Sequence, residues 1–197
     1  MSVNWSPEVQ MFDLAGLNEA IAKLKPHRRN GDGGDEDGDE HKGLTGKLIS
    51  AAGFDRCTIN KTMLTDEKLS KMRRRVELVC FRRKMKSEEV VAEVAKMGKL
   101  LATPAYILAI GFLYPDEQKT APIVQLDPTG ESEPIVLSTS CYGRNATPGH
   151  FDGPGWPEHI RFVVVDPTTE LLAAEEDDSE QKAEKESTAL TEALEWV

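Results

Sequence analysis

Four residues in the C-terminal half of the chain could take part in catalysis: Cys141, His150, Asp152 and His159. A cysteine becomes a nucleophile when a histidine lies within hydrogen-bond reach and a third group, here Asp152, orients that histidine. His150, Asp152 and His159 also match, in residue type, a metal site of two histidines and one carboxylate. Sequence spacing alone establishes neither contact, so we assign no catalytic residue and no metal ligand. A small Cys/His or metal-dependent enzyme remains the alternative function.

An acidic, glycine-rich stretch at residues 30–41 invites comparison with a calcium-binding loop. An EF-hand loop needs glycine at its sixth position and glutamate at its twelfth. Counted from Asp35, those positions hold Glu40 and Gly46, so the motif fails. We therefore predict a solvated linker here, and we predict no cofactor and identify no small-molecule substrate.

Basic residues concentrate in one segment of an otherwise acidic chain. Residues 66–86 contain nine lysines and arginines against three acidic residues, whereas the whole chain has a formal net charge of -10. An N-cap threonine followed by two carboxylates predicts a helix over this segment. One side of that helix would carry the candidate nucleic-acid-binding residues Lys68, Lys71, Arg75, Arg82 and Lys86. Their partner could be a nucleic acid backbone, an acidic protein segment, including one of this chain, or water alone.

Length and composition favour one domain with extensions. The chain has 197 residues, of which 39% are hydrophobic and 29% charged, and a domain typically takes roughly 100–150 residues. Its three widely spaced cysteines form neither a disulfide framework nor a metal knuckle, which is typical of a reducing compartment. The sequence contains no secretory leader pattern and no apolar run of about 20 residues. We therefore expect a soluble, cytoplasmic protein.

Composition divides the chain into four segments. Residues 1–26 are predicted to form an amphipathic helical arm that begins near Ser6, with a second possible start at Asp13. Residues 27–43 form an acidic, glycine-rich linker and residues 169–197 an acidic tail, and both are expected to be disordered because they contain too few apolar residues. The end of the tail can form a short amphipathic helix on a partner. Residues 44–168 are expected to be the α+β core domain.

The core domain is centred on residues 103–115, the only run that is apolar on every side. Thr103 and Pro104 suit the start of a helix and Gly111 suits its end, so we favour a short buried helix. A strand remains the alternative, because periodicity cannot separate the two for so short a run. Before this run, residues 87–102 are predicted to form a helix that pairs with the basic helix as a hairpin.

Strands are expected after the central run. Residues 123–126 and 135–139 flank an Asp-Pro-Thr-Gly turn, which predicts a β-hairpin. Residues 142–158 contain glycines and prolines and are predicted to be a long loop, followed by a central strand at residues 160–165. The predicted fold class is therefore α+β, with a helical hairpin and a buried apolar helix packed on a small, mostly antiparallel sheet.

These patterns favour a non-enzymatic assembly, adaptor or structural protein. It would act through protein–protein contacts, including association with copies of itself as a homo-oligomer. A specific form of this hypothesis is an RNA-binding subunit of the coat or nucleoprotein kind, with residues 66–86 on the RNA backbone. The alternative is the enzyme centred on Cys141, His150, Asp152 and His159.

Overall fold

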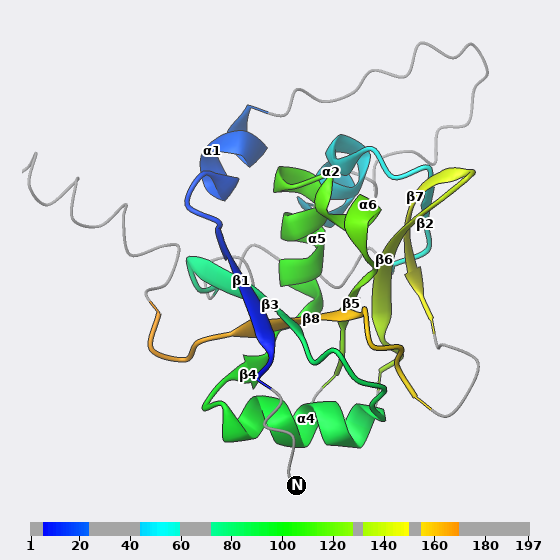
Figure 1. Ribbon diagram of the computed structural model, residues 1–197. Helices are drawn as coiled ribbons and strands as arrows, with labels where there is room; N and C mark the ends of the chain where they lie inside the picture. The colour runs from blue at the N-terminus through cyan, green and yellow to red at the C-terminus, as the bar shows by residue number, and fades with distance from the viewer. Residues whose placement is uncertain (1–5, 24–43, 60–71, 128–131, 150–154, 170–197) are drawn as a thin grey trace, which may run out of the picture.

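A computed structural model describes residues 6–23, 44–59, 72–127, 132–149 and 155–169 of the chain. The described helices are α1 (Leu17–Ala22), α2 (Leu44–Ala52), α4 (Ser87–Lys96), α5 (Pro104–Leu113) and α6 (Glu117–Thr120). They pack against one mixed sheet of eight strands. Figure 1 shows α4 on one face of this sheet and the other four helices on the opposite face. This arrangement agrees with the predicted α+β class.

The eight strands belong to one continuous sheet. They are β1 (Glu8–Asp13), β2 (Arg56–Cys57), β3 (Arg75–Cys80), β4 (Leu100–Leu101), β5 (Ile123–Gln125), β6 (Ile135–Ser140), β7 (Gly143–Pro148) and β8 (Arg161–Val165). The strand order is β1-β3-β8-β5-β6-β7-β2, and β4 also pairs with β8. The β5–β8 and β2–β7 pairs are parallel and all other pairs are antiparallel. The sheet is mostly antiparallel, as predicted, but larger than expected.

The central apolar run forms the buried helix α5. Its residues 105–111 are all buried, which is possible because apolar side chains stand on every side of the helix. Thr103 occupies the N-cap position and Pro104 the first turn, where the N–H that proline lacks needs no partner. The predicted stop at Gly111 is wrong, since the helix continues beyond it. A Cβ at Gly111 would lie 2.5 Å from Phe54 Cζ, so glycine here permits a close approach.

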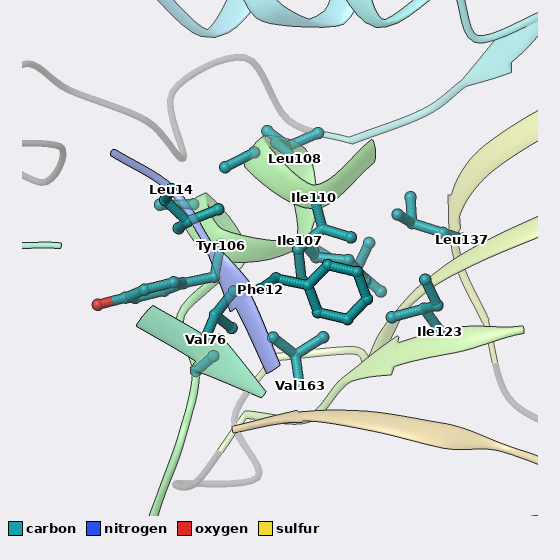
Figure 2. Close-up of a cluster of buried hydrophobic side chains, with 14 of the residues drawn as sticks. Phe12, Leu14, Val76, Tyr106, Ile107, Leu108, Ile110, Ile123, Leu137 and Val163 are labelled. Atoms are coloured by element: carbon teal, nitrogen blue, oxygen red, sulfur yellow. The ribbon is translucent and has the colours of Figure 1, made fainter. Parts of the chain in front are cut away.

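Two clusters of buried side chains hold the layers together, one on each face of the sheet. In the larger cluster, Phe12 of β1 and Val76 of β3 lie with Ile107 of α5, as Figure 2 shows. In the smaller cluster, Val90 and Val94 attach α4 to the opposite face. Successive residues of a strand point to opposite faces, so β3 and β8 contribute side chains to both clusters.

The helix predicted over residues 66–86 is wrong in the part that the structure describes. Residues 75–80 form β3, which pairs with both β1 and β8, so the predicted helical hairpin does not form there. Val76 and Val79 share one side of a helical wheel, but a strand places Val76 and Leu78 on one face and Val79 on the other. In the sheet, β3 buries apolar side chains on both of its faces, whereas a helix with one basic side would bury them on one side only. The predicted N-cap, Thr65, lies outside the described residues.

The helix predicted near Ser6 is also wrong for residues 8–13, which form β1. The proline of this segment, Pro7, suits an edge strand as well as the first turn of a helix, so the local signal was ambiguous. A helix does follow the second predicted start, Asp13, but it is the short α1. Leu14 and Leu17 are buried in the same cluster as α5, so this N-terminal segment packs on the chain's own core.

Part of the loop predicted over residues 142–158 is a strand. β7 pairs with β6, and Gly143 permits the turn between them with a φ of 105°. The helix predicted over residues 87–102 ends at Lys96. The β5–β6 hairpin and the central position of β8 are confirmed.

Several predictions fall on segments that the structure does not describe. They include the linker at residues 27–43, nearly all of the tail at residues 169–197 and the turn at residues 128–130. In the described part of the chain, no helix is long and apolar enough to cross a membrane.

Candidate functional site

The predicted Cys/His site is not assembled in the described part of the chain. Cys141 is exposed and follows β6 at the tip of the β6–β7 hairpin. His159 precedes β8 and lines a hollow that Cys141 does not line. His150 and Asp152 lie outside the described residues. Among the residues that are described, no group of three His, Cys, Asp or Glu side chains is placed to hold a metal ion.

The five predicted nucleic-acid-binding residues do not share one helical face. Lys68 and Lys71 lie outside the described residues. Arg75 is the first residue of β3, Arg82 follows that strand, and Lys86 is the N-cap of α4. Because a strand rises about 3.3 Å per residue, Arg75 stands about 16 Å from Cys80 at the other end of β3, and Arg82 follows beyond that end. The three described cations therefore do not form the compact row that the helix prediction required.

Carboxylates of the same chain neutralise part of this basic segment. Arg82 Nε donates to Glu8 Oε2 of β1 at 2.9 Å, and this hydrogen bond raises the pKa of Arg82. Arg83 Nη2 lies 3.7 Å from Glu93 Oε1 of α4. The acidic partners thus come from a neighbouring strand and helix. They reduce the positive charge that this segment could offer to a phosphate backbone.

β1 is the terminal strand of the sheet among the described residues, and its outer edge has no neighbouring strand there. Leu14 N–H donates to Arg74 O at 2.7 Å, which extends the antiparallel β1–β3 ladder by one pair. In an antiparallel ladder, alternate residues direct both backbone groups to the same neighbour. The even-numbered residues of β1 therefore face β3, while Val9 and Met11 direct N–H and C=O to the outer edge.

The side chains of the same two residues are exposed. Val9 is 43% exposed and Met11 69%. Val9 stands opposite Val79 and Met11 opposite Glu77, and opposite residues share a face of the sheet. Val79 packs with the side chains of α4, so Val9 and Met11 lie on the α4 face but at its uncovered margin. An unpaired strand edge that carries exposed apolar side chains is a template for another strand.

A hollow of about 810 Å³ lies beside β1 on the other face of the sheet. It is lined by Glu8, Val9, Gln10, Leu78, Cys80, Arg82, Thr120, Ala121, Glu158, His159 and Arg161. Arg161 is the most buried of its charged residues. Its Nη1 lies 2.9 Å from Glu117 Oε2 and its Nη2 donates to Ala121 O at 2.8 Å, so it ties β8 to the end of α6.

The groups that line this hollow suit binding better than nucleophilic chemistry. The Cys80 thiol donates to Glu158 O at 3.2 Å, so its proton is engaged with a backbone carbonyl and not with a base. The rim carries the Arg82–Glu8 ion pair. Hydrogen-bonding groups of both charge signs thus surround the hollow. They can contact polar side chains of a partner that lies along β1.

The open edge and the hollow were missed by sequence reasoning. A signal for the edge does exist, because the apolar Val9 and Met11 alternate with the polar Glu8 and Gln10 at the period of a strand. The serine and proline that precede them fit the start of an edge strand as well as the start of a helix. The hollow has no comparable signal, since its lining residues come from four separate segments that only the fold brings together.

No protein-family model matches the chain, no curated protein was found to be similar to it, and no solved structure was found to share its fold.

Proposed function

We propose that this protein is a non-enzymatic assembly or adaptor protein that binds an extended protein segment along the outer edge of β1. The observation that supports this most is the double role of Val9 and Met11. Both direct their backbone groups to the edge, and both keep their side chains exposed. Strand addition uses these features together, because backbone hydrogen bonds supply affinity and alternate side chains supply specificity.

Two contributions would stabilise such a complex. Each new backbone hydrogen bond replaces one to water and is worth about 0.5–1.5 kcal/mol net. Burial of the exposed apolar surface of Val9 and Met11 adds about 25 cal/mol per Å². On the other face, the hollow beside Glu8 and Gln10 offers polar contacts to the partner's remaining side chains.

RNA binding by residues 66–86 stays a prediction, and so does the enzyme alternative. We rank protein binding above RNA binding because Glu8 and Glu93 pair with arginines of the basic segment. A phosphate backbone would have to compete with these carboxylates for the arginines. Salt would weaken the binding of the phosphate backbone further.

Peptide selection against the full-length protein tests the proposal. Random peptides of roughly six to eight residues, the length of a typical strand, would be selected for binding and measured again on a Met11→Pro variant. Proline at this position removes an outward N–H but no hydrogen bond of the β1–β3 ladder. We expect the selected peptides to protect the amides of Val9 and Met11 from hydrogen exchange. We also expect at least about tenfold weaker binding to the variant.

Leu100→Ala is the matched control for this experiment. Leu100 is an exposed apolar residue on β4, away from the open edge. Its truncation should leave the affinity of the selected peptides unchanged. Peptides that bind wild type and Met11→Pro equally, without protecting the two amides, would rule out strand addition at β1.

A further inference from the structure

We infer that the segment bound at this edge is β1 of a second copy of the chain, in a two-fold symmetric, antiparallel pair centred on Gln10. This inference rests on the proposed function and names the partner. The two sheets would then join into one continuous sheet across the axis. Of the four large apolar side chains exposed in the described residues, two stand on this one strand, Val9 and Met11.

Two-fold symmetry limits the registers of such a pair. Opposite residues lie on the same face of a continuous sheet, so odd-numbered residues must meet odd-numbered ones. A pair centred on Val9 would set Met11 against Pro7, and a pair centred on Met11 would set Val9 against Asp13. Of these three centres, only Gln10 sets Val9 of each copy against Met11 of the other. That register therefore covers each exposed apolar side chain with another.

The same register joins the outward backbone groups. Val9 and Met11 both direct N–H and C=O to the edge, so each Val9–Met11 pair can exchange two hydrogen bonds. Pro7 of each copy falls opposite Asp13 of the other, whose N–H then meets the Pro7 carbonyl. The N–H that proline lacks therefore costs one bond in each of these two pairs. Gln10 forms the pair on the axis without backbone bonds, where opposite side chains come closest.

The charges of β1 stand at its two ends and each has an arginine beside it. Glu8 pairs with Arg82, and Asp13 Oδ1 lies 3.3 Å from Arg74 Nε. In the register centred on Gln10, Glu8 of one copy stands opposite Phe12 of the other and Asp13 stands opposite Pro7. No carboxylate of β1 therefore faces another carboxylate across the axis. The centre of the strand, from Val9 to Phe12, carries no charge that would oppose the contact.

A charge-exchange experiment tests both the dimer and its register. Full-length protein would be prepared as Val9→Glu, as Met11→Lys and as the double variant, and its association measured by sedimentation equilibrium. Either single change places a charge against an apolar side chain, and we expect about tenfold weaker association or more. In the double variant the introduced lysine faces the introduced glutamate of the other copy. We expect its association to return to within about threefold of wild type.

Other registers predict a different result for the double variant. A pair centred on Met11 would place two introduced lysines together, and a pair centred on Val9 would place two introduced glutamates together. Both changed side chains are exposed, so circular dichroism should show an unchanged fold. As a control, Leu100→Lys introduces the same charge at an exposed apolar position on β4 and should leave association unchanged.

Three outcomes would overturn the inference. Wild-type protein that stays monomeric at about 100 µM would exclude a dimer of useful affinity. A dimer that the single variants leave intact would use another surface. A double variant that associates no better than the singles would exclude the register. In each case, peptides selected at the edge of β1 would still support the proposed function, with a different protein as partner.

Discussion

α5 and β1 are both rich in apolar residues, but one is surrounded by the core and the other is paired along one edge. Residues 105–111 of α5 are all buried, whereas in β1 only Phe12 is buried. A helix satisfies its backbone groups internally, so burying its side chains completes its interactions. A strand needs a neighbour on each edge, and β1 has one, β3, in the described part of the chain. Substitutions in α5 should therefore affect folding, and substitutions on the outside of β1 should affect association.

The largest difference is expected between truncations in the two regions. Ile107→Ala in α5 removes a fully buried side chain and leaves a cavity, so we expect the free energy of unfolding to fall by about 2–5 kcal/mol. Met11→Ala on β1 removes a mostly exposed side chain and should change the unfolding of the monomer by less than about 1 kcal/mol. Urea unfolding of both variants at low concentration measures the difference. Similar losses would show that β1 is packed as firmly as α5.

An intermediate difference in stability is expected between variants of a buried arginine, Arg161, and of an exposed arginine at the edge, Arg82. Arg161→Met keeps much of the side-chain volume but removes the bonds to Glu117 and Ala121, so we expect a loss of about 2–3 kcal/mol. Arg82→Met removes only the exposed pair with Glu8 at the edge, and the loss should be much smaller. Thermal unfolding monitored by circular dichroism would compare the two. A larger loss for Arg82→Met than for Arg161→Met would contradict this expectation.

The smallest effect concerns Asp13 at the end of β1. Partial burial raises the pKa of Asp13, but hydrogen bonds from the Ala15 N–H and from Arg74 together lower it more, so the net pKa is below its ordinary value. The Asp13 carboxylate therefore stabilises the fold at pH values above its pKa in the unfolded chain. This stabilisation is lost as the pH falls through its pKa in the folded protein. Because the side chain is half-exposed, we expect a loss below about 1 kcal/mol, between about pH 5 and pH 2.

Asp13→Asn provides the comparison that isolates this effect. The other carboxylates titrate in both proteins, so the difference between wild type and variant reports on position 13. Urea unfolding at a series of pH values should show the two proteins converging as the pH falls. A constant difference across the acid range would mean that the Asp13 carboxylate does not contribute through its charge.

The elements that the sequence predicts correctly carry strong local signals. α5 follows an N-cap threonine and a first-turn proline, and residues 105–111 leave no polar face to expose. The β5–β6 hairpin follows from a turn sequence between two β-branched runs, and β8 from a short run of the same kind. In each case the residues that decide the conformation lie next to one another in the chain.

β1 and β3 were predicted incorrectly because their local signals fit two structures. Val76 and Val79 fit a helical stripe as well as a strand buried on both faces. Pro7 fits the start of a helix as well as the start of an edge strand. The choice depends on pairing with β8, a strand that lies about eighty residues further along the chain. β7 was missed for a different reason, since its pairing with the adjacent β6 depends on a glycine turn rather than on apolar periodicity.

The candidate site shows the same division between features set by neighbouring residues and features set by long-range pairing. By itself the sequence determined a buried apolar helix, a hairpin, a central strand and a segregated basic segment, because composition and neighbouring residues suffice for these. Only the tertiary structure decided that Arg82 pairs with Glu8 and that β1 is the terminal strand among the described residues. It also decided that Val9 and Met11 face outward, since the direction of a backbone N–H depends on which side the neighbouring strand occupies.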